Sequence, residues 1–177
     1  VEPNSTSFAG PLAWGSNITL GATVSALTLG KAGNTAAINV NSSASVLTVD
    51  GPITVHSSGG VTQTSGIQAS SLALFGNSGT GNFTLQNEDN QVDTLAASGV
   101  GNLSYWNSDA LTIGTVGSTD GIGASGTVDV QTLTEDLTVA KDVTTTNTSA
   151  NAVILNAAKS TAAGTATDGN VVLTGTR

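Results

Sequence analysis

The fold is decided by residues 53–74, which read ITVHSSGGVTQTSGIQASSLAL. Both ends of this stretch are apolar-x-apolar triplets, Ile53-Thr54-Val55 and Leu72-Ala73-Leu74. Alternation of apolar and small residues is typical of a β-strand that buries one face. Gly, Ser and Thr, which favour turns and loops, fill most of the segment between the triplets. The stretch therefore predicts short strands that are separated by turns.

The same triplet recurs along the whole chain, at a spacing of about 20 residues. This spacing relates Ile18 to Ile38, Leu27 to Leu47, Phe83 to Leu103, and the series Ile53, Leu72, Val92 and Leu111. Two or three short strands per repeat indicate one coil of a β-solenoid, and 177 residues would make eight or nine such coils. Asn-Gly is absent and Asp-Gly pairs are few, which argues against the many tight hairpins of an antiparallel sandwich.

We therefore predict an all-β fold, a parallel β-solenoid with coils of about 20 residues, as a single unit over residues 1–177. Residues 1–14, with Phe8, Leu12 and Trp14, are expected to form a partial cap, and residues 159–170 an insertion or wide turn. The predicted core consists of the inward-facing residues of the triplets. They are Ile18, Leu20, Leu27, Leu29, Ile38, Val40, Leu47, Val49, Ile53, Val55, Leu72, Leu74, Phe83, Leu85, Val92, Leu95, Leu103, Leu111, Ile113, Val128, Val130, Leu137, Val139, Val171 and Leu173.

Composition narrows the classes of protein to consider. Only 9% of the residues are charged, the net charge is −8, and Cys is absent. Few basic residues argue against nucleic acid as a partner, and no apolar run approaches the roughly 18 residues of a membrane span. Without Cys there is no disulfide and no thiolate metal site. Outward Thr, Ser and Asn can stack from coil to coil without charge repulsion, and these features favour a secreted or cell-surface protein.

Acidic residues cluster at Glu88, Asp89 and Asp93, which makes them the candidate metal ligands. Paired carboxyl groups could also cleave a glycosidic bond. Asn87 to Asn90, however, has the composition of a turn between strands, where Asp and Asn cap backbone groups. His56 follows the apolar Val55, points outward in the strand pattern and has no second His or Cys as a partner. We therefore expect no catalytic residue, no cofactor and no dedicated metal site.

Residues 60–74 (GVTQTSGIQASSLAL), 90–97 (NQVDTLAA), 103–105 and 110–116 (ALTIGTV) together resemble the repeat region of filamentous haemagglutinin-type large exoproteins of Gram-negative bacteria. The resemblance is close over about a third of the chain and looser over most of the rest. It implies a right-handed parallel β-helix that serves as the rigid stalk of a secreted or surface adhesin. The Asn-Pro-Asn-Gly motif of the family's amino-terminal secretion domain is missing, so the resemblance does not extend to that domain.

The leading functional hypothesis is a non-catalytic structural segment of an adhesin or extracellular fibre. The alternatives are a carbohydrate-active β-helix enzyme and an ice-binding solenoid, the latter because Thr144-Thr145-Thr146-Asn147-Thr148 supplies one Thr row. Residues Val171 to Arg177 continue a strand pattern, which predicts either further chain beyond Arg177 or copies that stack head to tail by strand addition. A host surface or a glycan is the other expected partner.

Overall fold

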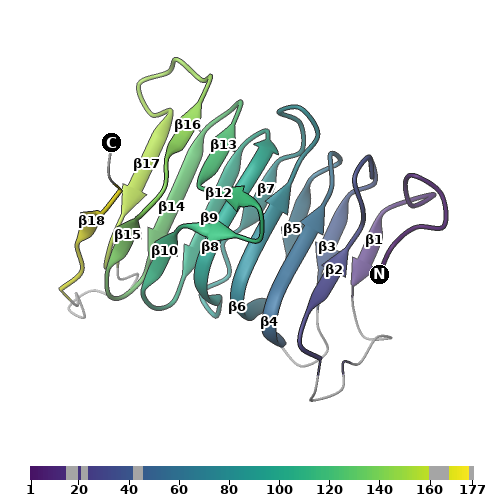
Figure 1. The fold of residues 1–177 in the computed structure, drawn as a ribbon, viewed down its shortest axis with the longest axis horizontal. Coiled ribbons are helices and arrows are strands. Elements are labelled where there is room, and N and C mark those ends of the chain that lie inside the picture. The colour runs from purple at the N-terminus through teal and green to yellow at the C-terminus, as the bar shows by residue number, and fades with distance from the viewer. Residues whose placement is uncertain (15–19, 21–23, 42–45, 160–167, 176–177) are drawn as a thin grey trace.

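The chain is a β-solenoid of about six coils, in a computed structural model that describes residues 1–14, 20, 24–41, 46–159 and 168–175. The coils follow one another along the long axis of the molecule, and the two termini lie at opposite ends (Figure 1). The described residues contain no helix, hence none that could cross a membrane. The predicted all-β, parallel β-helix fold is confirmed.

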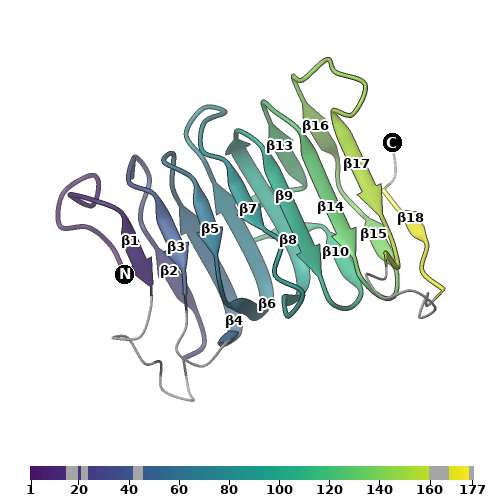
Figure 2. The ribbon, with the colours of Figure 1, turned by 180° about the vertical axis from the view of Figure 1, so that it is seen from behind.

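Sheet A contains seven parallel strands, contributed in order by successive turns of the solenoid, which lie side by side in Figure 2. The strands are short, and most of them alternate inward apolar with outward polar residues, for example Leu103 and Ser104. In order they are β1 (Leu12–Trp14), β3 (Ile38–Val40), β5 (Val61–Gln63), β7 (Phe83–Leu85), β9 (Leu103–Asn107), β14 (Val128–Thr132) and β17 (Val153–Asn156).

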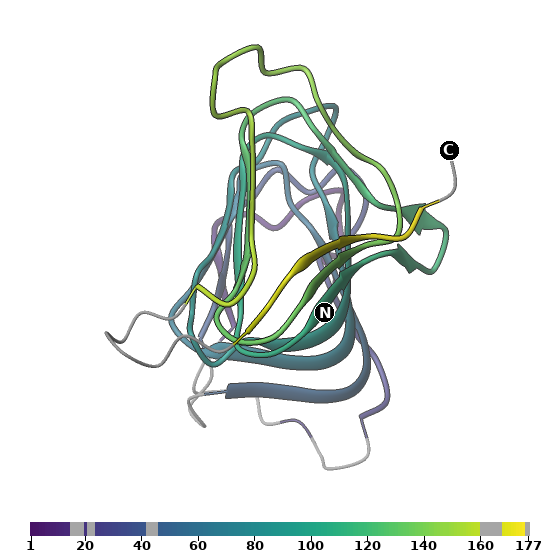
Figure 3. The same cartoon turned by 90° about the vertical axis from the view of Figure 1, so that its left-hand side faces the viewer.

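Sheet B contains nine strands and bends around the other sides of each coil (Figure 3). Its main path runs through β2 (Leu27–Leu29), β4 (Val46–His56), β6 (Gly66–Phe75), β8 (Gln91–Val100), β10 (Leu111–Ile113), β15 (Leu137–Val139) and β18 (Val171–Leu173). Two further strands, β13 (Ile122–Ala124) and β16 (Val143–Thr145), extend it beside the end of β8. Every described pairing within sheets A and B is parallel.

The β-solenoid is right-handed, because the chain turns counter-clockwise as it advances toward a viewer at its C-terminal end (Figure 3). The predicted coil length of about 20 residues is too short, since the coils average about 23. The number of residues between paired positions varies from coil to coil. It is smallest for Leu95 and Ile113, which are 18 residues apart (113 − 95), and largest for Leu137 and Val171, which are 34 apart (171 − 137). Turns of unequal length cause this variation, and so fewer coils form than the eight or nine predicted.

Several predicted partners of the triplets are wrong for the same reason. Leu27 pairs with Ile53 rather than with Leu47, and Leu72 pairs with Leu95 rather than with Val92. The pairs Ile53 with Leu72 and Phe83 with Leu103 are as predicted. Ile18, whose predicted partner is Ile38, lies outside the described residues.

The core is one continuous apolar column along the axis, with Trp14, Tyr105 and Phe83 as its largest fully buried side chains. All predicted core residues within the described part are buried except four. Leu20 and Val139 are half-buried, while Val171 and Leu173 are 41% and 73% exposed. Val171 and Leu173 belong to the last coil, where no described coil lies above them, so their assignment to the core was wrong.

A hairpin that was not predicted interrupts the coil between β10 and β13. It consists of β11 (Thr115–Val116) and β12 (Thr119–Asp120), which pair antiparallel. Val116 packs over Ala73 and Ala96 on the outer face of sheet B, and the three side chains are buried together. The covering hairpin explains why these outward positions carry Ala rather than the usual Thr.

Candidate functional site

The acidic turn predicted at Glu88 and Asp89 is present, and both residues are exposed. Asn87 organises it: its Oδ1 accepts a 2.9 Å hydrogen bond from the Asp89 backbone N–H, and its Nδ2 donates to the carbonyl of Thr64 in the preceding coil. Asn87 thus shapes the turn and ties it to the neighbouring coil, as expected of turn residues.

Asp93 lies elsewhere, in a groove of about 390 Å³ on the outside of sheet B. The groove crosses successive coils and is lined mainly by Thr48, Asp50, Gln68, Ser70, Gln91 and Asp93. Among the described residues, no three His, Cys, Asp or Glu side chains lie close enough together to hold a metal ion. Glu88, Asp89 and Asp93 therefore do not form the metal site for which they were candidates.

Amide side chains join the coils along this groove. Gln68 Nε2 donates to Gln91 Oε1, and Gln91 Nε2 donates to Asp109 Oδ2. The donor–acceptor distance is 2.7 Å in both hydrogen bonds. A similar ladder connects Asn102 Nδ2 to Asn82 Oδ1 (3.0 Å) on another corner. The side-chain amide groups thus hydrogen-bond to side chains of neighbouring coils, and these bonds link the coils along the axis.

Buried asparagines form a polar feature that was not predicted from the sequence. Asn90 is fully buried; its Oδ1 accepts from the backbone N–H of Ile67 (2.9 Å) in the preceding coil. Its Nδ2 donates to the carbonyls of Leu85 (3.1 Å) and Trp106 (2.9 Å), the latter in the following coil. One side chain therefore joins three coils. The sequence shows only an Asn in front of a strand pattern, which does not tell whether the side chain points inward.

His56 stacks on Phe75 of the next coil, with ring centroids 4.5 Å apart and planes at 14°. Burial lowers the pKa of His56 below its ordinary value, and the nearby Glu2 carboxylate opposes that change to a smaller extent. The imidazole thus packs as a mainly neutral ring against the next coil.

Of the adjacent aromatic residues Tyr105 and Trp106, Tyr105 is fully buried and Trp106 is half-buried on the outer face of sheet A. The Nζ of Lys159 lies 5.8 Å from the centre of the Trp106 ring. Trp106 is therefore the member of the pair that faces outward, and the ammonium group of Lys159 covers it.

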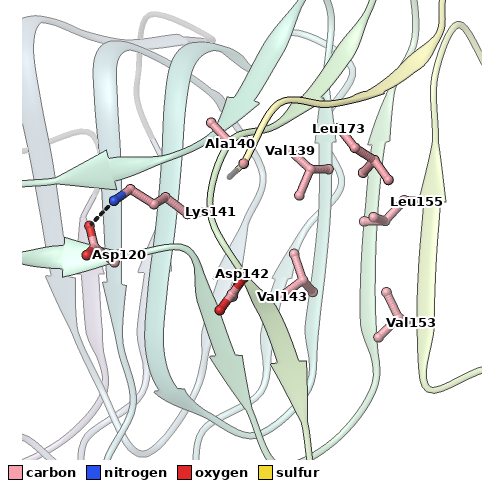
Figure 4. A pocket seen from close by; sticks show the side chains of 10 residues that line it. Asp120, Val139, Ala140, Lys141, Asp142, Val143, Val153, Leu155 and Leu173 are labelled. Atoms are coloured by element: carbon pink, nitrogen blue, oxygen red, sulfur yellow. Dashed lines mark ion pairs between the residues drawn. The ribbon is translucent and has the colours of Figure 1, made fainter. Parts of the chain in front are cut away.

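A hollow of about 670 Å³ lies at the C-terminal end, and its lining includes Val139, Val143, Val153, Leu155 and Leu173 (Figure 4). Charged groups occupy one side only: Lys141 Nζ and Asp120 Oδ1 form an ion pair of 3.6 Å, and Asp142 lies beside them. The hollow is an open coil end that both apolar and polar groups line.

Comparison with known proteins identifies no relative: no family model, no curated protein and no solved structure matches this chain.

Proposed function

We propose that the chain is a non-catalytic structural segment of a secreted or cell-surface adhesin or extracellular fibre, in which it serves as a rigid stalk. The observation that carries the proposal is the unbroken sequence of coils, each joined to the next by two parallel sheets and by side-chain ladders such as Gln68 to Gln91. Such a rod keeps its two ends at a fixed separation. The extracellular part rests on the sequence resemblance to large exoproteins and on the scarcity of charge.

The stalk role is tested by measuring rigidity. Ala13 and Ile154 belong to one outward column of sheet A and are separated by six strand spacings, about 29 Å at 4.8 Å each. Because the chain has no Cys, spin labels can be attached at Ala13→Cys and Ile154→Cys alone. A stalk gives a narrow distance distribution near this value. Moving the first label to Asn39→Cys shortens the distance by one spacing, whereas broad distributions contradict a rigid stalk.

A carbohydrate-active enzyme is the second candidate, favoured by the position of two carboxyl groups. Asp50 and Asp93 line the same groove, and β6 lies between their strands, which places the two backbones about 10 Å apart. Inverting glycosidases hold their two carboxyl groups roughly 6.5–9.5 Å apart, and side chains that lean toward each other from backbones at this separation can reach that distance. Incubation with acidic and neutral polysaccharides, followed by assay of reducing and unsaturated ends, separates the two candidates.

The structural proposal predicts no products and unchanged surface binding in Glu88→Ala, Asp89→Ala and His56→Ala. Hydrolysis that disappears in Asp93→Asn but survives in Glu88→Gln would establish the enzyme instead.

A further inference from the structure

Two polar groups on the outer face of sheet A differ from the rest of the protein in their hydrogen bonding. Within the described part of the chain, two buried side-chain atoms have no hydrogen-bond partner, and they are Trp106 Nε1 and Gln131 Oε1. Buried polar atoms of this kind are rare, because an unmade hydrogen bond destabilises the folded chain. Trp106 of β9 and Gln131 of β14 are paired in register on neighbouring strands (Figure 2). The two exceptions therefore lie side by side in adjacent coils.

The two atoms are complementary in their chemistry. The indole Nε1 can only donate a hydrogen bond, and the carbonyl oxygen of Gln131 can only accept one. The amide of Gln131 has a fixed orientation, since its Nε2 donates to Asp129 Oδ1 (2.6 Å) and a carboxylate oxygen cannot donate in return. Gln131 is 3% exposed, so packing also restricts its movement. The pair thus offers one donor and one acceptor in neighbouring positions.

A hydroxyl group satisfies both atoms, because it accepts from an N–H and donates to a carbonyl oxygen at the same time. Water and a sugar hydroxyl share this chemistry, and the surrounding side chains favour the sugar. The indole of Trp106 offers apolar surface to the C–H groups of a pyranose ring. Ser104 and Asp129, in register on the neighbouring outward column, supply oxygens for further hydroxyl groups. A few placed polar groups beside an aromatic surface are typical of a small-ligand site.

Lys159 covers this part of sheet A. Its Nζ lies 5.8 Å from the centre of the Trp106 ring, and the residue is exposed. A cation–π contact at an exposed position is weak, and the lysine side chain is long and flexible. A ligand that contacts the indole therefore displaces the ammonium group at little cost.

We propose that Trp106, Asp129 and Gln131 form a binding site for a neutral pyranose unit of a glycan. One sugar hydroxyl accepts from Trp106 Nε1 and donates to Gln131 Oε1, while Lys159 moves off the indole. The sugar is neutral because the Asp129 carboxylate and the net charge of −8 oppose an anionic ligand. The inference goes beyond the stalk role and does not depend on it, since a rigid segment is a stalk with or without a ligand.

The chain contains only two Trp residues, Trp14 and Trp106, which makes the test direct. A proton–nitrogen correlation spectrum of the whole chain shows one indole N–H signal from each, and Trp106→Phe assigns them. The chain is titrated with methyl glycosides of glucose, galactose, mannose and N-acetylglucosamine up to about 0.1 M, because single sugars bind weakly. At least one glycoside shifts the Trp106 signal saturably. The Trp14 signal stays in place, because its side chain is 1% exposed in the core.

Three variants measure the contribution of each group. Gln131→Leu removes the acceptor and weakens the affinity about threefold to tenfold, the effect of one neutral hydrogen bond. Trp106→Phe keeps an aromatic ring without the N–H and weakens it by a similar factor, measured by saturation transfer to the sugar. Lys159→Ala removes the competing ammonium group and strengthens binding about twofold to fivefold. Circular dichroism checks that each variant is folded.

Gln68→Leu is the matched control, because it removes the same amide from the groove on sheet B and leaves the affinity unchanged. The absence of a saturable shift with every glycoside would show that the two atoms bind water only, and would overturn the proposal. A shift that Gln131→Leu leaves unchanged, or weaker binding in Lys159→Ala, would overturn it as well. None of these results alters the spin-label distances, which test the stalk role separately.

Discussion

The phenol of Tyr105 donates a 3.0 Å hydrogen bond to Oδ1 of Asn107, and both side chains are fully buried in the core. The same Oδ1 accepts from the backbone N–H of Val92 (2.9 Å), and Nδ2 donates to the carbonyls of Asp109 and Ala110. Asn107 therefore supplies the hydrogen bonds of the turn that leads from sheet A into sheet B. Burial raises the pKa of Tyr105, so the phenol stays protonated and remains a donor.

The first prediction compares the two members of this pair. Tyr105→Phe removes one donor while Asn107 Oδ1 keeps the N–H of Val92, so the free energy of unfolding falls by about 1 kcal/mol. Asn107→Leu leaves several buried backbone groups without partners and lowers it by about 3 kcal/mol or more. Urea unfolding measures both changes, and Asn39→Ala, on the exposed outer face, is the control. Equal losses at 105 and 107 would contradict this ranking.

The second prediction concerns the thin core at β10. Leu111 is 1% exposed, so Leu111→Asp buries an unpaired carboxylate and lowers the free energy of unfolding by about 4 kcal/mol or more. Thr112→Asp is the matched control, because Thr112 faces outward between Thr94 and Thr138 and tolerates a charge within about 1 kcal/mol. Thermal unfolding followed by circular dichroism distinguishes the two variants. A mild Leu111→Asp phenotype would place Leu111 outside the core.

The inward and outward faces of the strands were predictable because alternation depends only on neighbouring residues. Ile53 and Leu72 follow this rule, and both are fully buried. Pairing between coils was harder to predict, since the triplets resemble one another and Leu27 would fit against either Leu47 or Ile53. The number of residues in the intervening turn decides between them, and turns are the least regular part of the sequence.

The buried Asn90 and Asn107 were not predicted, because an Asn in a turn has the same sequence appearance whether its side chain points inward or outward. The hairpin of β11 and β12 did have a signal. Gly117-Ser118 is a two-residue loop between two strand-forming pairs, and Gly117 has a positive φ of 61°. Asn-Gly and Asp-Gly are therefore not the only pairs that mark a tight hairpin in this chain.

The third prediction separates backbone strain from coil stacking at two glycines. Gly117 and Gly121 both have positive φ, 61° and 62°. A Cβ on Gly117 would meet nothing within 4 Å, whereas one on Gly121 would lie 2.1 Å from the carbonyl oxygen of Asp142 in the next coil. Gly117→Ala therefore lowers the free energy of unfolding by about 1 kcal/mol, through strain alone. Gly121→Ala lowers it by at least about 2 kcal/mol more, because β13 and β16 must move apart. Similar unfolding midpoints in urea would show that this contact between coils is easily relaxed.

The fourth prediction concerns the pH dependence that His56 contributes. Its pKa in the folded chain is lowered from 6.5 by burial, so the folded state binds fewer protons there than the unfolded state does. The stability that results is fully present above pH 6.5 and is lost as the pH falls below that value toward the lowered pKa. His56→Phe keeps a ring stacked on Phe75 and removes the titrating group, so its free energy of unfolding changes less between pH 7.5 and about pH 5.5 than that of the unmodified chain.

Urea unfolding at a series of pH values measures the difference, and Glu2→Gln is the second variant. Loss of the Glu2 carboxylate removes a group that raises the His56 pKa, so Glu2→Gln steepens the pH dependence, the opposite of the effect of His56→Phe. Parallel pH profiles for all three proteins would show that the His56 ring is solvated as freely in the folded chain as in the unfolded one.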